Sequence, residues 1–340
     1  MEDVLIIGAG IFGLTLARKL KKAGRDVRVV DAVGIGGGAS ATPLGVLAPH
    51  APDRWNAKKE AQFEALTSLP DYLAELEDET GIDTGYRRCG RLIPLRTENL
   101  ATIWHARVED ARQNWRGAAE IEIVEADPDW LSPDAAKFGA ARCGLTARID
   151  APAYLRALAC SIGEDRIEGG YRLKALEDEA ALFDNGERVA ARLIVLATGA
   201  AAFEFLPDHD DEPAGRGEWG SLALFELDPK ADTRPILFER GCYVVPRAAG
   251  EIAVGVTSSK APIDDEVLDR RIGEARDLCP ALSDAKERTR WQAIRPRAAN
   301  KLIVNAPHPS RPNIWVATGG FKTGLAMAHQ LDAPSHLGFG

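Results

Sequence analysis

The sequence predicts an α/β fold in which a domain built on a parallel sheet is joined to a second, mostly antiparallel α+β domain. Three observations lead to this fold class. A short apolar run near the start is followed by a glycine-rich turn and a helical pattern. A second apolar run ends near residue 197 in Thr-Gly, and several short strands separated by turn residues follow residue 215. With 340 residues, the chain exceeds the usual size of one hydrophobic core, so two domains are expected.

Composition narrows the class of protein. The net charge of −9 and pI near 5.3 argue against a nucleic-acid-binding or anionic-membrane surface. No apolar run approaches transmembrane length, and no signal peptide fits before the first strand, so we expect a cytoplasmic protein without a membrane span. The five cysteines are scattered and never spaced C-x-x-C, which favours reduced thiols. The six histidines show no metal-binding spacing, so no metal is expected.

The first unit predicts dinucleotide binding. Val4 to Ile7 is an apolar run typical of a strand buried on both faces, and G-x-G-x-x-G and a helical pattern follow it. Gly8 permits a tight turn, Gly10 lets the backbone approach a pyrophosphate, and Gly13 lets the helix pack close to the strand. The N–H groups at the start of the helix, at the positions of Ala9, Ile11 and Phe12 among others, are suited to hold phosphates.

A second strand and an acidic residue complete the unit. Residues 26–30 are rich in valine, and Asp31, followed by Ala32, comes directly after them. A carboxylate in this place accepts a hydrogen bond from a ribose hydroxyl. Because NAD and FAD both contain the adenosine ribose, Asp31 does not distinguish between them.

The next segment fits a cofactor longer than its adenosine half. A glycine-rich loop over residues 33–42 would, taken alone, be a flexible connection. Its position after the ribose-binding strand favours contact of its backbone N–H groups with a pyrophosphate or ribityl chain. The small residues that would make this contact are Ala39, Ser40, Ala41 and Thr42. Gly45, Val46 and Leu47 then form an apolar segment suited to lie along a flat ring.

The middle of the chain predicts several ordinary elements. Residues 58–79 have a helical pattern with one apolar side, broken at Pro70. Residues 87–95 and 120–124 read as strands, the second half-exposed. Asp150 is expected to be the N-cap of a helix that continues to residue 158.

A second buried strand is expected at residues 193–197. Residues 171–176 and 181–183 predict two strands before it, with an Asp-Asn-Gly turn after the second. The strand ends in Ala197, Thr198 and Gly199, which places these residues beneath the phosphates of a cofactor bound at the first unit.

From about residue 215 the pattern changes to that of an antiparallel sheet. Its expected strands cover residues 221–227, 236–239, 243–246 and 251–257. The last two form a hairpin, a helix is expected at 264–279, and residues 290–296 return toward the first domain. Near the end, a strand at 313–317, a glycine turn at 318–324 and a short helix at 325–331 would place a helix N-terminus beside the cofactor.

Seven motifs, in this order along the chain, resemble those of the D-amino-acid oxidase / glycine oxidase family of FAD-dependent amine-oxidising enzymes. They are GAGIFG, ASATPLGVLAP, YRRCGRLIPL, VLATGA, CYVVPRAAGEIAVGVT, WQAIRP and TGGFKTGLA. The first is common to many nucleotide-binding proteins, whereas the tyrosine hairpin, the Arg-Pro segment and the closing glycine turn are much more specific. The resemblance implies FAD as cofactor and a Rossmann-like FAD-binding domain of the GR2 type, with a mostly antiparallel substrate domain above the flavin.

The resemblance also implies domain boundaries and cofactor contacts. The FAD-binding domain would comprise residues 1–85, 145–215 and 296–340, and the substrate domain residues 86–144 and 216–295. Beyond the cofactor residues given above, the resemblance adds Leu173, Arg295, Gly319, Gly320, Phe321, Lys322, Thr323, Gly324 and Leu325.

Two residues are implied to act on the substrate. Arg295 stands where the family has the arginine that clamps the substrate carboxylate, and Tyr243 where it has a tyrosine lining the substrate pocket. A planar guanidinium binds a carboxylate through two hydrogen bonds and so fixes its orientation. Lys322 stands where glycine oxidases tend to carry arginine, Gly320 where they carry histidine, and Ser258 at a pocket position where methionine is expected.

The expected function is FAD-dependent oxidation of the C–N bond of a small amino acid, with glycine, sarcosine or a D-amino acid as substrate. Hydride would pass from Cα to flavin N5, and the resulting imine would hydrolyse; the electrons would pass to O₂ or another acceptor. Three alternatives stay open: an NAD(P)-dependent dehydrogenase, a flavoprotein of the same fold acting on another amine such as a modified tRNA base, and a non-catalytic flavin-binding subunit. The sequence also leaves open a homo-oligomer and the mode of flavin attachment.

Overall fold

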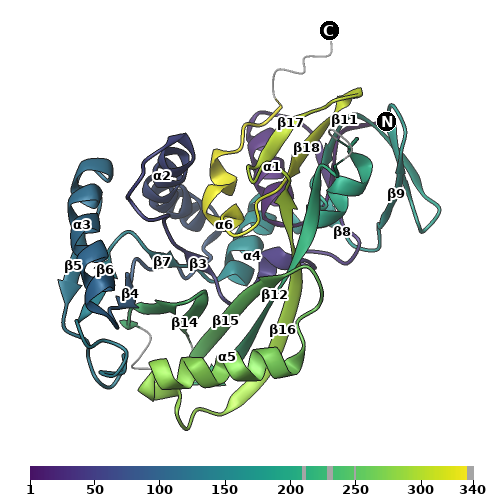
Figure 1. Ribbon diagram of the computed structural model, residues 1–340. Coiled ribbons are helices and arrows are strands. Elements are labelled where there is room, and N and C mark those ends of the chain that lie inside the picture. Colours follow the sequence, from purple (N-terminus) through teal and green to yellow (C-terminus); the bar gives the residue numbers. More distant parts are fainter. Residues whose placement is uncertain (209–211, 228–232, 249, 335–340) are drawn as a thin grey trace.

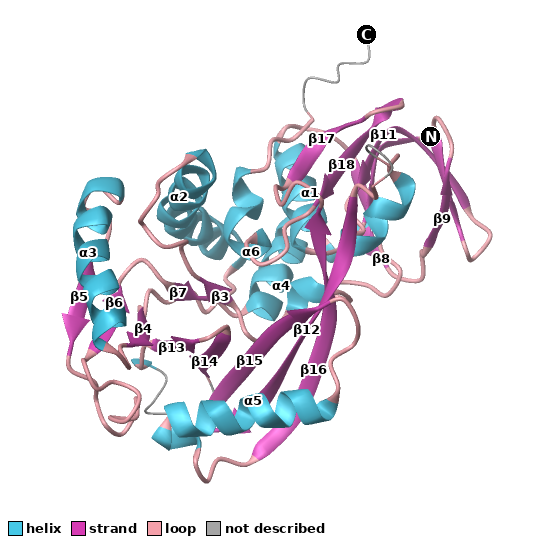
Figure 2. Ribbon diagram, in the orientation of Figure 1, coloured by secondary structure: helices cyan, strands magenta, loops and turns pink. Residues whose placement is uncertain are grey.

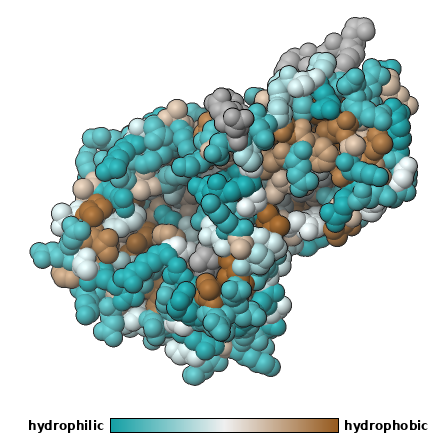
Figure 3. Space-filling model, turned by 45° about the vertical axis from the view of Figure 1, so that its right-hand side comes forward, coloured by the Kyte–Doolittle hydropathy of each residue, from teal (hydrophilic) through white to brown (hydrophobic). Residues whose placement is uncertain are grey.

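The computed structural model describes residues 1–208, 212–227, 233–248 and 250–334. Within these residues the chain forms two eight-stranded sheets and one two-stranded sheet (Figure 1). No helix of the described chain is long and apolar enough to cross a membrane. The face shown in Figure 3 is mostly hydrophilic, and its hydrophobic residues gather in separate patches.

The first sheet has the strand order β17-β18-β11-β1-β2-β8. The strands from β18 to β8 are parallel, whereas β17 joins antiparallel at one edge, and β9 and β10 extend β11 antiparallel. The bounds are β1 Glu2–Ile7, β2 Val27–Val30, β8 Ile167–Glu168, β9 Leu173–Leu176, β10 Ala180–Phe183, β11 Arg188–Leu196, β17 Val304–His308 and β18 Arg311–Thr318. The predicted strands of this region are therefore confirmed, although β11 begins five residues earlier than the strand predicted at 193–197.

Two apolar layers bury the first sheet. The side chains of Val4 and Ile6 pack with helices α1 (Ile11–Lys22), α2 (Ala57–Thr80) and α4 (Ala151–Ile162). Leu5 and Ile7 point to the other face, where residues of β9 to β11 and the 3₁₀ helix η3 (Gly199–Phe205) cover them. Because β1 is buried on both faces, its sequence is a continuous apolar run instead of an alternating one.

Helix α2 corrects one prediction, because it runs through Pro70 without a break. The helix begins after Asn56, whose side chain accepts a hydrogen bond from the Lys59 N–H, and it ends at Gly81, whose φ is +71°. Its apolar side is buried throughout and consists of Phe63, Leu66, Leu69, Leu73 and Leu76. Tertiary packing of this side offsets the backbone hydrogen bond that proline removes. The predicted N-cap of α4 is confirmed, since Asp150 accepts from the Ala153 N–H at 2.9 Å.

The second sheet has the strand order β16-β12-β15-β14-β13-β4-β6-β5 and is antiparallel except between β13 and β4. The bounds are β4 Arg91–Pro94, β5 Ile121–Val124, β6 Ala140–Cys143, β12 Gly215–Glu226, β13 Ile236–Glu239, β14 Cys242–Arg247, β15 Glu251–Ser259 and β16 Glu287–Ala298. The strand predicted at 87–95 is shorter than expected, because Gly90 has φ +75° and Arg87 makes only an isolated bridge. Helix α3 (Glu98–Asn114) lies beside β5 and β6 (Figure 1).

Helix α5 (Asp265–Leu278) covers one face of the second sheet, as Figure 2 shows. Its buried residues Leu268, Ile272, Ala275 and Leu278 pack against side chains of β12 to β15, including Val244 and Val254. Side chains that alternate with these along the strands therefore point to the opposite face, toward the first sheet.

Strands β12 and β16 lie side by side and run from the second sheet toward the first (Figure 1). Gly215 pairs with Ala298 at that end, beside Phe203 of η3. The predicted domain boundaries at 215/216 and 295/296 fall within or next to these strands. We retain this division as a proposal in which β12 and β16 join two domains, each organised around one sheet.

The last helix differs from the prediction at 325–331. Helix α6 comprises only Gly324–Met327, and a 3₁₀ turn, η6 (Ala328–Gln330), follows it. A single turn carries little of the macrodipole of a full helix. The helix N-terminus expected to face the cofactor here is therefore a weak electrostatic feature, whereas α1, which begins at the first glycine turn, is a helix of 12 residues.

Candidate active site

The glycine turn after β1 has no space for side chains at two positions. A Cβ atom on Gly8, whose φ is +118°, would lie 2.3 Å from the carbonyl oxygen of Ala197. A Cβ on Gly13 would lie 1.8 Å from the carbonyl oxygen of Gly8. Both contacts are with backbone atoms, so neither neighbour can move aside cheaply. Glycine is required here because it lets β1, β11 and the start of α1 approach one another.

The start of α1 presents backbone donors. The Ile11 N–H donates to Ser40 Oγ at 3.0 Å, which holds the loop after β2 over the helix start. Among the described residues, none accepts a hydrogen bond from the N–H of Phe12 or Gly13. Donors of this kind at the N-terminus of a full-length helix are suited to an anionic ligand, so the turn fits the pyrophosphate of a dinucleotide.

The Asp31 carboxylate organises the loop that follows β2. Its Oδ2 accepts from the Ala9 N–H at 2.8 Å, and its Oδ1 accepts from the N–H groups of Val33 and Gly34 at 2.8 and 3.0 Å. An ionised carboxylate has about four acceptor positions, so one remains for a ribose hydroxyl. Asp31 thus has a structural role that the sequence did not predict, in addition to the predicted contact.

Segments from both ends of the chain meet beside this turn. The Thr318 hydroxyl donates to the carbonyl oxygen of Gly199 at 2.7 Å, joining the ends of β18 and β11. A Cβ on Gly320 would lie 2.8 Å from the ring of Phe12, so the C-terminal glycine turn packs directly on α1. The structure therefore brings together the predicted segments 8–13, 39–42, 197–199 and 319–325. Leu173 is at the start of β9, two residues after Tyr171, whose N–H donates to the Asp31 carbonyl oxygen at 2.9 Å, and its contact with the cofactor stays a prediction.

The segment Gly45–Leu47 approaches the second sheet. Gly45 has φ +53°, and its Cβ would collide with the Ile149 carbonyl oxygen at 1.9 Å. Strand β3 (Val46–Leu47) pairs with β7 (Ala147–Arg148), and the preceding Leu44 side chain packs on the backbone of Gly255 in β15. The loop after β2 therefore lies against the face of the second sheet that α5 leaves uncovered.

Arg295 and Tyr243 lie on this same face, although they are far apart in the sheet order. Tyr243 pairs with Gly255, Gly255 pairs with Leu222, and Leu222 pairs with Trp291, so these residues share one face. Arg295 is four residues from Trp291 on β16, which places it on the same face. Strands β15 and β12 lie between β14 and β16.

Arg295 belongs to a group of cations around one buried carboxylate. Glu218, directly opposite it on β12, is 3% exposed and accepts from Arg216 at 2.8 Å and from Arg297. Burial alone raises the pKa of Glu218, but the hydrogen bonds from Arg297 and Arg216 outweigh it and lower the pKa below its usual value. For Arg295 burial lowers the guanidinium pKa, and the negative charge of Glu218 opposes this effect.

Glycine 220 makes the space that the Arg295 side chain occupies. A Cβ on Gly220 would lie 1.4 Å from Nη2 of Arg295. The centroid of the Phe321 ring lies 5.8 Å from Cζ of Arg295 and 5.0 Å from Cζ of Arg297. Loss of surrounding water lowers the pKa of Lys322, and the positive charge of Arg295 lowers it further. The site therefore concentrates positive charge where a carboxylate or a negatively charged ring edge would be stabilised.

The sequence missed two members of this face, Glu218 and Arg91. Arg91 on β4 donates from Nη1 to the Tyr243 hydroxyl at 3.4 Å and lies over the ring of Phe238. Glu218 belongs to none of the seven motifs, and Arg91 lies within YRRCGRLIPL without a role assigned to it, so only the strand pairing places both at the site. Arg295 and Arg297 are two residues apart on one strand, so the sequence could have indicated that an acidic residue on a neighbouring strand pairs with them. It could not have shown which acidic residue this is.

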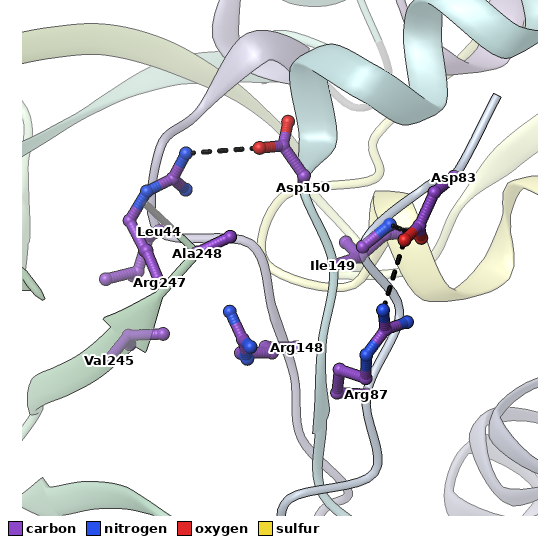
Figure 4. A pocket seen from close by; sticks show the side chains of 10 residues that line it. Leu44, Asp83, Arg87, Arg148, Ile149, Asp150, Val245, Arg247 and Ala248 are labelled. Carbon is purple, nitrogen blue, oxygen red and sulfur yellow. Dashed lines mark hydrogen bonds and ion pairs between the residues drawn. The ribbon is translucent and has the colours of Figure 1, made fainter. Parts of the chain in front are cut away.

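A cavity of about 70 Å³ lies beside Leu44 (Figure 4). Figure 4 shows Arg148 between Val245 and Arg87, with Arg247 bound to Asp150 and Arg87 bound to Asp83. Arg247 also donates to the carbonyl oxygen of Pro43. Because the cavity has room for only a few water molecules and is lined by ion pairs, we interpret it as part of the contact between the sheets.

A parallel sheet with a glycine turn, backbone donors at a helix start and a carboxylate after the second strand is typical of a dinucleotide-binding protein. Residues 3–331 match the family described as FAD dependent oxidoreductase, so the chain belongs to that family. The cofactor is therefore FAD, as predicted, and the alternative of an NAD(P)-dependent dehydrogenase is wrong.

Similar proteins with known names indicate the kind of reaction within this family. The bifunctional protein ThiO/ThiG of Nostoc is 28% identical over 96% of this chain, which spans about half (51%) of that relative's length. The glycine oxidase of Pseudomonas aeruginosa is 26% identical over 96% of this chain and 92% of its own length. The crystal structure of glycine oxidase from Geobacillus kaustophilus has a TM-score of 0.83 and 21% identity, covering 97% of this chain and 92% of that one. The fold prediction is thereby confirmed, and FAD-dependent oxidation of an amine or amino acid is supported.

Proposed function

We propose that this protein oxidises the C–N bond of a small amino acid, with glycine, sarcosine or a D-amino acid as substrate. The observation that carries this proposal is the partly buried Arg295 guanidinium on the sheet face that meets the loop after β2. Relatives named glycine oxidase support the same substrate class. FAD held at the glycine turn after β1 would supply, through its flavin ring, the acceptor for the hydride that leaves the substrate Cα.

Arg295 would hold the substrate carboxylate through two parallel hydrogen bonds. Its partial burial strengthens this interaction because less water competes for the guanidinium. Glu218 and Gly220 fix the position of the side chain, the first by charge and the second by leaving space. A substrate held in this way loses most of its rotational freedom before it reacts.

The concentration of cations favours a neutral substrate amine. Arg295, Arg297 and Lys322 repel an ammonium group and stabilise the form that has lost its proton. A neutral amine lets the nitrogen lone pair assist departure of hydride from Cα, and water then hydrolyses the imine. No side chain is needed as a base at Cα, so Tyr243 would line the pocket and donate a hydrogen bond to the substrate.

Anaerobic reduction of the flavin tests this function. The purified yellow protein is mixed without oxygen with glycine, N-methylglycine and D-alanine, and the flavin absorbance band is followed. We expect at least one of these amino acids to bleach the band, and admission of air then shows whether O₂ restores it. An Arg295→Met variant should need a substrate concentration higher by about tenfold or more, because a hydrogen-bonded charge pair is lost.

The control variant is Arg290→Met, which removes an exposed arginine from the same strand. Arg290 binds Asp265 and Asp269 at the surface, on the side of α5. This variant should reduce the flavin as the unaltered protein does. If none of the amino acids bleaches the flavin while an unrelated amine does, the proposed substrate class is wrong.

A further inference from the structure

Arg91 is a buried cation that has no carboxylate partner among the described residues. Its side chain is 7% exposed, and no described residue accepts a hydrogen bond from its Nε. Its contacts in the described structure are the Tyr243 hydroxyl at 3.4 Å and the Phe238 ring, whose centroid lies 5.1 Å from Cζ. A buried charge without a paired anion is costly, so its presence in the structure needs an explanation.

The carboxylate of Glu239, which follows Phe238 in the sequence, does not pair with Arg91. Glu239 follows Phe238 on β13, so its side chain points to the opposite face of the sheet. There it accepts hydrogen bonds from Arg96. No described carboxylate lies within ion-pair distance of Arg91, so an anion that pairs with it must come from outside the described chain.

The Tyr243 hydroxyl adds a second donor at the same place. A guanidinium only donates, so the tyrosine oxygen accepts from Arg91 and its own hydrogen points elsewhere. No described group accepts this hydrogen. The O–H of Tyr243 and the Nε–H of Arg91 are thus two donors without acceptors in one small region. This combination is suited to one carboxylate.

Arg91 and Arg295 lie on the same sheet face but on different strands. Arg91 pairs with Ile236, which shares the face of Phe238 and Tyr243. Strands β13, β14, β15 and β12 lie between β4 and β16 in the sheet. Tyr243, on β14, therefore lies between the two arginines in the sheet order. A carboxylate bound at Arg295 therefore leaves the donors of Arg91 and Tyr243 without an acceptor, and a second anionic group can bind there.

We propose that Arg91 and Tyr243 form a second carboxylate-binding point in the substrate pocket, so that the preferred substrate is an amino acid with two carboxylates. One carboxylate binds at Arg295 and the other at Arg91 and Tyr243. This inference rests on the proposed function, because it takes Arg295 as the point that holds the first carboxylate. It goes beyond that function by naming the charge of the substrate.

Binding of unreactive acids tests the second point without turnover. The purified yellow protein is titrated with succinate and with butyrate, which have the same number of carbon atoms, and the change in flavin absorbance gives each Kd. We expect succinate to bind at least about tenfold more tightly, because only succinate supplies the second charge. Equal affinities in the unaltered protein would overturn the proposal.

Variants then assign the preference to Arg91. Arg91→Met removes the guanidinium but keeps an unbranched apolar side chain, and it should reduce the preference to about twofold or less. Arg91→Lys keeps the charge and should restore part of it. Arg142→Met is the matched control, because Arg142 lies on the neighbouring strand β6, is exposed and binds Glu122. The preference of this variant for succinate over butyrate should be unchanged. If Arg91→Met still prefers succinate, or if it loses affinity for succinate and butyrate equally, Arg91 does not form a second carboxylate-binding point.

Turnover separates this proposal from the proposed function. The flavin of the unaltered protein should be reduced at lower concentrations of D-aspartate than of D-alanine, and of N-carboxymethylglycine than of N-methylglycine. If no amino acid reduces the flavin but succinate still binds through Arg91, the function fails and the anion site stands. If D-alanine and N-methylglycine react as well as their dicarboxylic counterparts, the substrate preference is wrong and the function stands.

Discussion

The substitution Gly220→Ala tests the role of Arg295 without removing any charged group. The added Cβ would lie 1.4 Å from Nη2 and 2.3 Å from Cζ of Arg295. Ordinary van der Waals contact begins at 3.4 Å, so the guanidinium must move by about 2 Å. The backbone of Gly220 does not have a positive φ, and alanine is therefore allowed in β12.

The expected effect follows from this displacement. A guanidinium that moves by about 2 Å loses the geometry of a two-point carboxylate contact, and a misplacement of about 1 Å in a reacting complex costs on the order of 100-fold. We therefore expect the flavin to be reduced with a half-saturating substrate concentration raised by about 10- to 100-fold. The assay is stopped-flow flavin bleaching without oxygen, over a range of substrate concentrations.

A matched control is Gly273→Ala. A Cβ on Gly273 in α5 meets no atom within 4 Å, and alanine favours the helix by about 1 kcal/mol. This variant should keep the substrate affinity and gain a little thermal stability. If Gly220→Ala folds, binds FAD and shows the same substrate affinity as the unaltered protein, the proposed carboxylate contact of Arg295 is refuted.

Four further outcomes follow from the contacts described. Gly13→Ala should destabilise the protein by about 1–3 kcal/mol or more and lower its FAD content, because its Cβ would meet the Gly8 oxygen at 1.8 Å; the melting temperature and the ratio of flavin to protein absorbance measure this, and full retention of FAD would contradict it. Asp31→Ala should lower the affinity for FAD, since it leaves three N–H donors without their acceptor; titration of the apoprotein gives the Kd, and an unchanged value would contradict it. Asp150→Ala should cost about 1 kcal/mol through the lost N-cap of α4, whereas Asp150→Asn should cost less because asparagine also caps a helix; urea unfolding compares them. Because the pKa of Glu218 is lowered in the fold, its contribution to stability is present above the ordinary value of 4.5 and is lost as the pH falls through the lower folded value; melting temperatures between pH 3 and 7 should therefore fall less steeply for Glu218→Gln, and identical slopes would contradict this.

Local sequence determined the elements whose physical requirements are local. Gly8 and Gly13 were predictable because a tight turn and a close helix need the absence of Cβ, and the structure shows those collisions. The apolar run of β1 predicted burial on both faces, and Asp150 predicted a helix start. Pro70 misled the prediction, since its local cost is outweighed by packing of the apolar side of α2.

Long-range pairing decided the substrate side of the site, and no local pattern shows it. Arg295 and Tyr243 could be named from a resemblance, but their shared sheet face follows from the register of β14, β15, β12 and β16. Glu218 and Gly220 become part of the site only through that register, and Arg91 only through the pairing of β4 with β13 and of β13 with β14. The physical reason is that strand pairing joins residues distant in the chain, so a side chain's charge environment is set by neighbours that its own segment does not contain.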